Sequence, residues 1–412
     1  MNLLKLVGSY LVARPLNSLL NIILLALGLA VISVLILFNR QFQEKISANS
    51  KGIDLVVGAK GSPLQIILCS VFHIDFPTGN IQLPEAERLA RHRLVKKAIP
   101  LALGDSYRNF RIVGATPDYP ALYHVQLKEG KWFGADLEVV AGSQVALELG
   151  LKIGSTFSSA HGLTEEGHAH EENQYRVVGL AQPTGTVMDN LIFTAVSSVW
   201  RVHEDHGEEG QSAQAIGSES SLVPGASGGD STREITSLLI QFRNPIAAIQ
   251  LPRLINGQTN MQAASPAFET ARLFSILGVG VDVLRGFAYV LILISGLSIF
   301  IALYNSLKER QYDLAIMRSM GASRFRLFLS IQLEGFTFTF LGSLLGLALG
   351  HAALWMFVEL FPGGQRAGMS AAVFYPEELW LMGGSWVLGL LCALLPAVQA
   401  YRTDIHQILS RS

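Results

Sequence analysis

The sequence predicts an α-helical membrane protein with four transmembrane helices and a large α+β extracytoplasmic domain inserted between spans one and two. A hydrocarbon core of about 30 Å needs roughly 20 apolar residues in a helix. Four stretches of the chain reach that length, one near the N-terminus and three in the last third. The polar block 39–285 separates the first stretch from the second, so we expect one large domain on one side of a membrane.

Composition supports membrane burial and excludes other classes. The chain has 412 residues, of which 50% are hydrophobic and only 15% are charged, whereas a soluble domain usually carries about 25% charged residues. A formal net charge of -1 gives no reason to expect nucleic acid as a partner. Cys392 falls in the last apolar stretch, which leaves Cys69 alone in the polar block. No intrachain disulfide is therefore expected.

The apolar stretches and their flanks set the expected boundaries. The first stretch is too long for a cleaved signal peptide and no A-x-A site follows it, so it is interpreted as a retained anchor. The expected order is an amphipathic segment (1–16), span one (17–38), the polar domain (39–285), span two (286–307), a short basic segment (308–326), span three (327–358), a short outer loop (359–378), span four (379–400) and a tail (401–412).

Positive charge in the short loops predicts the orientation. Cations are enriched in cytoplasmic loops next to membrane spans. The short segments at the two ends and between spans two and three contain Lys5, Arg14, Lys308, Arg310, Arg318, Arg324, Arg326, Arg402 and Arg411. Both termini and 308–326 are therefore expected in the cytoplasm, with 39–285 on the outer side of the membrane. Arg40, Lys45 and Lys51 argue weakly for the opposite orientation.

The polar domain has the pattern of a mixed α and β fold. Runs rich in β-branched residues and closed by Gly or Pro predict strands at 54–59, 110–115, 137–142, 175–181, 190–196 and 236–242. Helices are expected at 84–98 and 266–284. The apolar stretch 63–72 is too short to cross a bilayer and is expected in the core. Residues 207–232 are rich in Gly, Ser, Gln and Glu and predict a flexible loop.

The segment 307–335 is the most informative local sequence. It has a helical pattern that Gly321 interrupts, and glycine at that point permits a helix C-cap and a tight reversal. Ser323 is placed to cap the next helix. A short charged helix between two spans is suited to docking a soluble partner, and it is equally consistent with an ordinary positively charged loop.

This segment resembles the permease signature of the MacB/FtsX group of ABC transporters (type VII). The matching residues are Glu309, Arg310, Asp313, Ala315, Ile316, Met317, Arg318, Gly321, Ala322, Ser323 and Glu334. The C-terminal segment resembles the closing pattern of that group through Pro396, Ala397, Ala400, Asp404 and Leu409. Asp313 stands where Glu is commoner and Ile405 where Pro is usual. Weaker similarity to the periplasmic core domain of the group occurs at 112–120, 140–154 and around 190–193.

The resemblance implies a non-catalytic permease in the bacterial inner membrane. Two copies, expected as a homodimer, would work with a separate cytosolic ABC ATPase, and 2–14 would form an elbow helix. The residues implied in ATPase coupling are Glu309, Arg310, Asp313, Met317, Arg318, Gly321, Ala322 and Ser323. The sequence has no G-x-x-x-x-G-K-[ST], so ATP and Mg²⁺ are expected on the partner. Gly58-Ala59-Lys60-Gly61-Ser62 is interpreted as a turn.

Polar and small residues within the third span suggest helix packing. Gly342, Gly346 and Gly350 repeat on one helical face, which predicts close approach of another helix within or between subunits. Glu334 is expected to pair with Arg318, Arg324 or Arg326, because an intramembrane carboxylate is costly without a partner. His351 is expected to be a packed polar residue.

Histidines in the polar domain suggest a metal site or a solvated loop. His161, His168, His170, His203 and His206 lie among carboxylates, and this mixture is a ligand set for Zn²⁺. The same residues are consistent with a solvated acidic surface. No H-E-x-x-H motif is present. G-x-S-x-G is matched only at 225–229, inside the Gly- and Ser-rich segment and not between a predicted strand and helix, so no catalytic residues are expected.

Two functional classes follow. The first is a permease that couples ATP hydrolysis on its partner to movement of its periplasmic domain, for export or mechanotransmission. The second is an FtsX-like or metal-sensing regulatory membrane protein, and a lipoprotein-releasing permease fits the same topology. A periplasmic adaptor or substrate protein and membrane lipids are the further partners expected.

Overall fold

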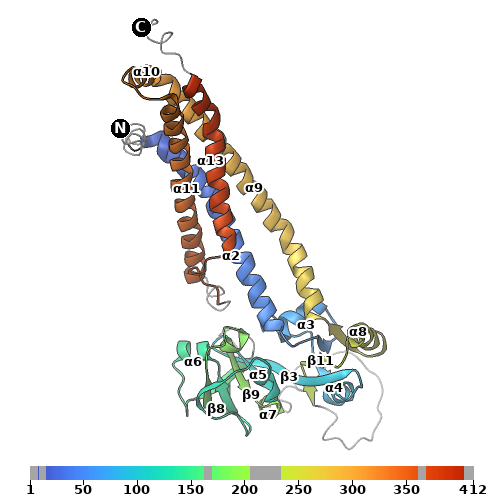
Figure 1. Cartoon of the computed structure of the whole chain (residues 1–412). Helices are drawn as coiled ribbons and strands as arrows, with labels where there is room; N and C mark the ends of the chain where they lie inside the picture. The colour runs from blue at the N-terminus through green and yellow to red at the C-terminus, as the bar shows by residue number, and fades with distance from the viewer. Residues whose placement is uncertain (1–7, 9–14, 162–168, 205–232, 361–367, 403–412) are drawn as a thin grey trace, which may run out of the picture. The chain divides into compact units, whose positions relative to one another are not determined.

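A computed structural model describes residues 8, 15–161, 169–204, 233–360 and 368–402 (Figure 1). The chain divides into a helical unit, Met1–Gln43 with Ile276–Ser412, and a sheet unit, Glu44–Ser275. The predicted flexible loop 207–232, and most of the predicted amphipathic segment 1–16 and tail 401–412, lie outside the described residues.

The described helices that are long and apolar enough to span a membrane are four in number, as the sequence predicts. They are α2 (Pro15–Ser50), α9 (Pro266–Glu309), α11 (Arg324–Leu360) and α13 (Pro376–Arg402). α2 and α9 are longer than the predicted spans and continue into the sheet unit. The predicted helix 266–284 and span two form one uninterrupted helix, and the charges that separated them, Asp282 and Arg285, pair with each other at 3.1 Å.

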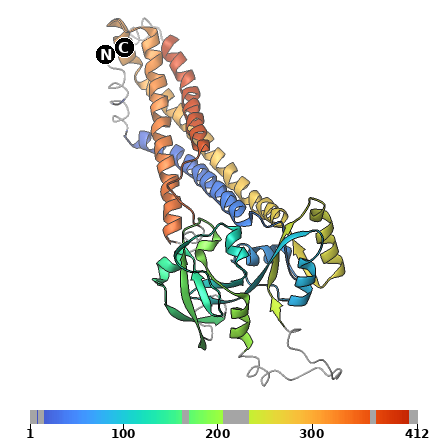
Figure 2. The ribbon, with the colours of Figure 1, turned by 60° about the horizontal axis from the view of Figure 1, so that its bottom comes forward.

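Small residues let the long helices of the helical unit approach closely. A Cβ built on Gly346 of α11 would lie 2.8 Å from the backbone oxygen of Ala26 on α2, and one on Gly350 would lie 2.8 Å from Cβ of Ser33. Gly342 meets Leu25 of α2 in the same way. The glycine face predicted on the third span therefore lies against α2 of the same chain. α11 and α13 run side by side in both ribbon views (Figures 1 and 2).

The sheet unit is built on a mixed ten-stranded sheet. The strands are β1 (Leu55–Ala59), β3 (Val95–Tyr107), β4 (Phe110–Ala115), β5 (Leu127–Gly130), β6 (Glu138–Ala141), β7 (Thr156–His161), β8 (Ala169–Ala181), β9 (Leu191–Thr194), β11 (Ser237–Phe242) and β12 (Met261–Ala264). Their order is β12-β1-β11-β3-β4-β9-β6-β8-β5, with β7 pairing β3 and β8. β4–β9 and β6–β8 are parallel, and β2 (Ile81–Gln82) pairs separately with β10 (Glu234–Ile235).

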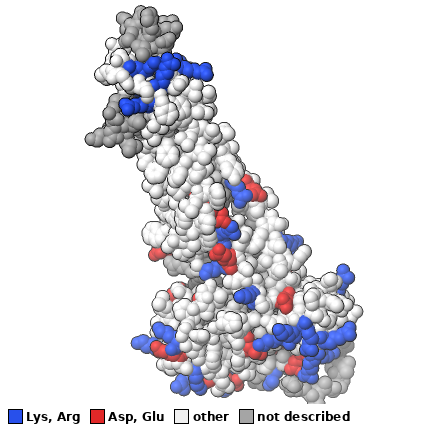
Figure 3. Space-filling view, in the orientation of Figure 1, with Lys and Arg blue, Asp and Glu red and all other residues white. Residues whose placement is uncertain are grey.

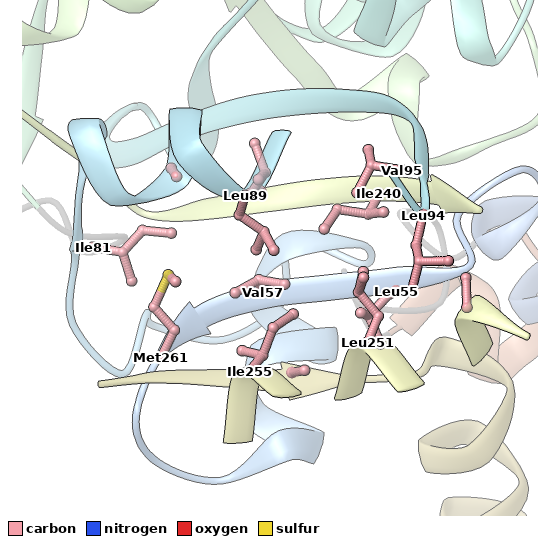
Figure 4. Close-up of a cluster of buried hydrophobic side chains, with 14 of the residues drawn as sticks. Leu55, Val57, Ile81, Leu89, Leu94, Val95, Ile240, Leu251, Ile255 and Met261 are labelled. Carbon is pink, nitrogen blue, oxygen red and sulfur yellow. The ribbon is translucent and has the colours of Figure 1, made fainter. Parts of the chain in front are cut away.

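Short helices complete the sheet unit. They are α3 (Pro63–Ser70), α4 (Leu83–Ala90), α5 (Asp118–Leu122), α6 (Ser143–Leu149), η1 (Val187–Asn190), α7 (Val196–Glu204) and α8 (Ala247–Gln258). α4 and α8 cover one part of the sheet, where Leu89, Leu251 and Ile255 pack against Leu55 and Val57 of β1 (Figure 4). A second core forms around Ile112, Val139, Tyr175 and Ile192.

Most elements predicted for the polar domain are present. Strands occur at all six predicted places, and the apolar stretch 63–72 is confirmed as core, since Ile66, Ile67 and Cys69 are buried on α3. The prediction of one helix over 84–98 is wrong beyond Ala90, because β3 begins at Val95. Residues of β3 pair with both β11 and β4. These ladder hydrogen bonds and the burial of alternate side chains outweigh the helical propensity of Lys96-Lys97-Ala98.

Candidate functional site at the basic end of the helical unit

The short helix α10 (Gln311–Ser319) joins α9 to α11 and ends in a defined C-cap. Gly321 has φ +97°, the Gly321 N–H donates to the Arg318 carbonyl at 3.0 Å, and the Ala322 N–H donates to the Met317 carbonyl at 3.0 Å. This pattern is a Schellman motif, which satisfies the last carbonyls of a helix. The C-cap that the sequence predicts at Gly321 is confirmed.

The start of α11 is capped as well. The hydroxyl of Ser323 accepts a hydrogen bond from the Arg326 N–H at 3.3 Å, as predicted. A serine at this position satisfies one of the backbone donors that a helix leaves unpaired in its first turn. The reversal between α10 and α11 is therefore specified by two adjacent local signals.

α10 is packed onto the long helices by one apolar face. Leu314 is 5% exposed and packs with Leu307 of α9, Leu327 and Ile331 of α11, and Ala397 and Ala400 of α13. Ala315 is also buried, and Met317 is partly buried against the same cluster. Because three long helices contribute to this cluster, a displacement of α10 would act on all of them.

The opposite face of α10 is exposed and surrounded by cations. Tyr312 is 50% exposed, Met320 is 74% exposed and Phe325, in the first turn of α11, is 63% exposed. Figure 3 shows Lys and Arg side chains gathered at this end of the helical unit, beyond a long uncharged surface. The basic end consists of Lys308, Arg310, Arg318, Arg324, Arg326 and Arg402.

A buried ion pair lies at the start of α10, where Arg310 is the N-cap residue. Nη1 of Arg310 lies 3.6 Å from Oε2 of Glu334, and the two side chains are only 15% and 9% exposed. The sequence predicts Arg318, Arg324 or Arg326 as the partner, and the structure corrects this to Arg310. Glu334 lies about three helical turns beyond Arg324 on α11, so it faces the junction between α9 and α10, where Arg310 lies.

The residues implied in coupling divide into exposed and packed groups. Glu309, Gly321 and Ser323 are exposed, whereas Met317, Arg318 and Ala322 are partly buried and Arg310 is engaged by Glu334. Asp313 lies on α10, and its side chain is outside the described residues. Sequence reasoning missed Tyr312, Met320 and Phe325 as surface residues. The sequence signal that could have identified them is the presence of large apolar side chains in a short segment outside the spans.

The C-terminal end of α2 is held within the sheet unit by hydrogen bonds. The Asn49 carbonyl accepts from the Tyr123 hydroxyl at 2.5 Å, Oδ1 of Asn49 accepts from the Val187 N–H at 2.9 Å, and Lys45 donates to the Gly185 carbonyl at 2.8 Å. β1, which follows α2, pairs with β12, which precedes α9. The two helices that leave the sheet unit are thus joined through neighbouring strands.

A cluster of buried polar side chains lies next to these hydrogen bonds. Nε2 of His73 lies 2.7 Å from the Tyr119 hydroxyl, and the ring of Tyr119 packs edge-on against Tyr123, with 5.7 Å between the ring centroids. Burial lowers the pKa of His73 to about 3, with the Arg111 guanidinium adding to the effect. Burial raises the pKa of Tyr119 and Tyr123 well above the usual value. All three groups are therefore uncharged at neutral pH, and Tyr123 connects this neutral cluster to the Asn49 carbonyl through its hydroxyl.

The histidines proposed as zinc ligands stay a prediction. His168 and His206 lie outside the described residues, as do the side chains of His161 on β7, His170 on β8 and His203 on α7. β7 and β8 pair Ala160 with Ala169, so the backbones of His161 and His170 lie at the same end of one strand pair. Within the described part of the chain, no group of three or more metal-ligating side chains is found.

Comparisons with known proteins identify the family. A model of the MacB-like periplasmic core domain matches residues 18–248, and a model of the FtsX-like permease C-terminal region matches residues 285–405. The chain belongs to the MacB/FtsX family of ABC-type permeases. The predicted resemblance and fold class are confirmed, because these matches cover both the helical end and the inserted domain of this multi-pass membrane protein. None of the curated proteins compared matches this permease.

Two solved domains are similar to part of this permease. The periplasmic region of MacB from Actinobacillus actinomycetemcomitans is 12% identical, with a TM-score of 0.33, covering 56% of this chain and 97% of that one. The extracellular domain of the ABC-type transporter YknZ from Gram-positive bacteria is 11% identical, with a TM-score of 0.29, covering 52% of this chain and 99% of that one.

Proposed function

We propose that this permease couples ATP hydrolysis by a separate cytosolic ATPase to movement of the sheet unit, for export or mechanotransmission. It would lie in the bacterial inner membrane with its termini and α10 in the cytoplasm and the sheet unit in the periplasm. The cations of the basic end support this orientation. The family supports an ATPase partner, and the 412 residues contain no phosphate-binding G-x-x-x-x-G-K-[ST] motif.

The observation that carries the proposal is the construction of α10. A segment that receives force from another protein must be rigid and must be connected to the parts that move. α10 ends in a Schellman motif, and Ser323 caps the start of the next helix, α11. Leu314 packs α10 against three long helices. Its other face presents Tyr312 and Met320 to solvent. Aromatic and methionine side chains are enriched at protein interfaces.

The route from α10 to the sheet unit is continuous along helices. α9 ends at Glu309 and α10 begins at Gln311. α9 is one helix back to Pro266, directly after β12, and β12 pairs with β1. A shift of α10 against an ATPase would act on α9 and α11 together. Only a difference of a few kcal/mol in binding between two states is needed to drive such a change.

A charge placed on α10 tests the proposal against a matched control. Met320→Glu adds a carboxylate at a side chain that is 74% exposed, and Leu147→Glu does the same at one that is 77% exposed on α6 of the sheet unit. If Met320 lies in an ATPase interface, burying the new charge lowers the affinity for the ATPase at least tenfold. Leu147→Glu leaves that affinity unchanged.

Co-purification of the ATPase with the full-length permease, followed by titration of the complex, provides the measurement. Equal ATPase binding by wild type, Met320→Glu and an Arg318→Ala/Gly321→Ala variant would overturn the assignment of this face. We further propose a homodimer of the permease, acting with a periplasmic adaptor or substrate protein, and these partners rest on the family alone.

A further inference from the structure

A polar clasp joins α2 to the far ends of α11 and α13 in the helical unit. The clasp consists of Ser33, Arg40 and Gln41 on α2, His351 on α11, Ser370, Ala371 and Tyr375 in the link before α13, and Glu377 and Glu378 at the start of α13. It lies at the opposite end of α11 from α10. The mechanism proposed above uses none of these residues.

The outer part of the clasp is a set of reciprocal hydrogen bonds. The side-chain amide of Gln41 donates to the Ser370 carbonyl at 2.8 Å and accepts from the Ser370 N–H at 2.7 Å. Gln41 is only 5% exposed, so these bonds are shielded from water. Arg40 forms an ion pair with Glu377 beside them. The link before α13 is therefore fixed to α2 through both backbone and side chains.

The inner part of the clasp centres on a fully buried carboxyl group. Glu378 is 0% exposed. Its Oε1 accepts from the Ser33 hydroxyl at 2.6 Å and lies 3.1 Å from Nε2 of His351. Its Oε2 accepts from the Tyr375 N–H at 3.1 Å, as the N3 residue of a capping box does. Gly350, next to His351, leaves the space that lets Ser33 approach.

The contacts of His351 and Glu378 are best satisfied when the pair holds one proton. Nδ1 of His351 lies 2.6 Å from the Ala371 carbonyl, and because a carbonyl only accepts, Nδ1 must carry hydrogen. The 3.1 Å contact between Nε2 and Oε1 then requires one more proton between them. That proton makes either an imidazolium with a carboxylate or an imidazole with a carboxylic acid. In both forms the pair is neutral overall.

We propose that His351 and Glu378 form a one-proton binding site that holds the clasp closed. Loss of the proton leaves two acceptors facing each other and a buried negative charge without compensation, and such a charge is costly. The clasp then opens and releases α2 from the α11–α13 link. Ionisable residues held in or beside membrane helices commonly have such functional roles. The role of this release in moving the sheet unit rests on the proposed function, whereas the proton site does not.

The other charges near the clasp do not replace the missing proton. Arg40 is engaged by Glu377. On α9, which packs against α2 through Gly28 and Ile292, Asp282 pairs with Arg285 at 3.1 Å. Glu359, the remaining charged residue at this end of α11 in the described chain, is exposed to solvent. Among the described residues of α2, α9 and α11, no cation without a partner is thus placed to neutralise Glu378 once the proton leaves.

The test follows clasp closure with pH in the full-length permease, without ATPase or nucleotide. Spin labels are placed at two exposed positions, Gln43→Cys on α2 and Ala372→Cys in the link, after Cys69 and Cys392 are replaced by serine. Dipolar coupling between the labels is measured in lipid nanodiscs from about pH 5 to about pH 9. We expect strong coupling at low pH and a fall of at least twofold in the closed fraction at high pH.

Two glutamine variants remove the buried carboxyl group without removing the hydrogen bond. In Glu378→Gln the amide donates to a neutral imidazole, and in the double variant His351→Gln/Glu378→Gln one amide donates to the other. Either variant is expected to keep the labels coupled across the whole range, and either suffices if the other does not fold. Ser33→Ala removes one hydrogen bond outside the proton site, so it retains the pH transition.

Wild-type coupling that does not change with pH would overturn the proposal, and so would a transition that persists in both glutamine variants. A loss of coupling at every pH in both variants would also overturn it. Failure of the proposed function appears elsewhere, as unchanged ATPase binding in Met320→Glu. The two outcomes are therefore distinguishable.

Discussion

At the scale of single residues, buried titratable groups are the most specific features of the permease. Arg310 and Glu334 pair near the basic end, Glu378 pairs with His351 at the far end, and His73 is held neutral in the sheet unit. Each group lies where an unpaired charge would be costly. Their partners come from distant parts of the chain, so their substitution reports on tertiary packing.

Removing Arg310 alone should destabilise the helical unit more than removing both members of its ion pair. Arg310→Leu leaves the Glu334 carboxylate buried without a cation, at a cost of about 3 kcal/mol. Arg310→Leu/Glu334→Leu should recover most of that loss. Thermal unfolding of the purified protein in detergent gives the comparison, and a double variant less stable than either single variant would contradict this interpretation.

His73 should make the sheet unit less stable as pH falls. Its pKa is lowered from 6.5 to about 3 in the folded protein. Below about pH 6.5 this histidine therefore binds a proton in the unfolded chain, whereas in the folded chain it binds one only below about pH 3. Its contribution to stability is fully present above that window and decreases as pH falls through it. Between about pH 7 and about pH 5 the expected loss is about 2 kcal/mol.

The matched comparison is His73→Asn with His124→Asn. Both histidines have positive φ, 54° and 55°, a conformation that asparagine tolerates, and His124 is exposed. Denaturant unfolding at the two pH values should show a weaker pH dependence for His73→Asn only. An equal pH dependence in the two variants would exclude the buried imidazole as the cause.

At the scale of elements, the contact of α11 with α2 depends on glycine. Gly346→Ala places a Cβ 2.8 Å from the Ala26 carbonyl oxygen, so the two helices must separate, at a cost of about 1–3 kcal/mol. Gly383→Ala on α13 is the control, because its Cβ would meet nothing within 4 Å and alanine favours a helix. Thermal unfolding should show a lower melting temperature for Gly346→Ala alone. Equal melting temperatures would argue against tight α2–α11 packing.

At the scale of the whole molecule, α2 is one helix from Pro15 to Ser50. It is held by the clasp at Ser33, Arg40 and Gln41 and by the sheet unit at Lys45 and Asn49. A helix fixed at both places can transmit displacement along its axis only while its backbone hydrogen bonds are intact. α2 is therefore a second helical connection to the sheet unit, besides the α9 route of the proposed mechanism.

Ser47→Pro should weaken the coupling of the sheet unit to the ATPase. Proline at this exposed position removes a backbone hydrogen bond and kinks the helix, whereas Ser47→Ala preserves it. We expect both variants to retain ATP hydrolysis in the complex. Only Ser47→Pro should show a smaller ATP-dependent change in hydrogen exchange of the sheet unit. A normal response in Ser47→Pro would show that α2 does not contribute to the transmission.

The sequence alone determined the four spans, the inserted domain and the caps around α10. These features depend on local chemistry, namely apolar length, glycine at a left-handed position and a serine hydroxyl at a helix start. β3 was missed, because its residues have helical propensity and become a strand only through β4 and β11. The partner of Glu334 and the clasp around Glu378 were decided by tertiary structure alone. Ser33 and Glu378 are separated by 345 residues, and only the packing of α2, α11 and α13 brings such groups within hydrogen-bonding distance.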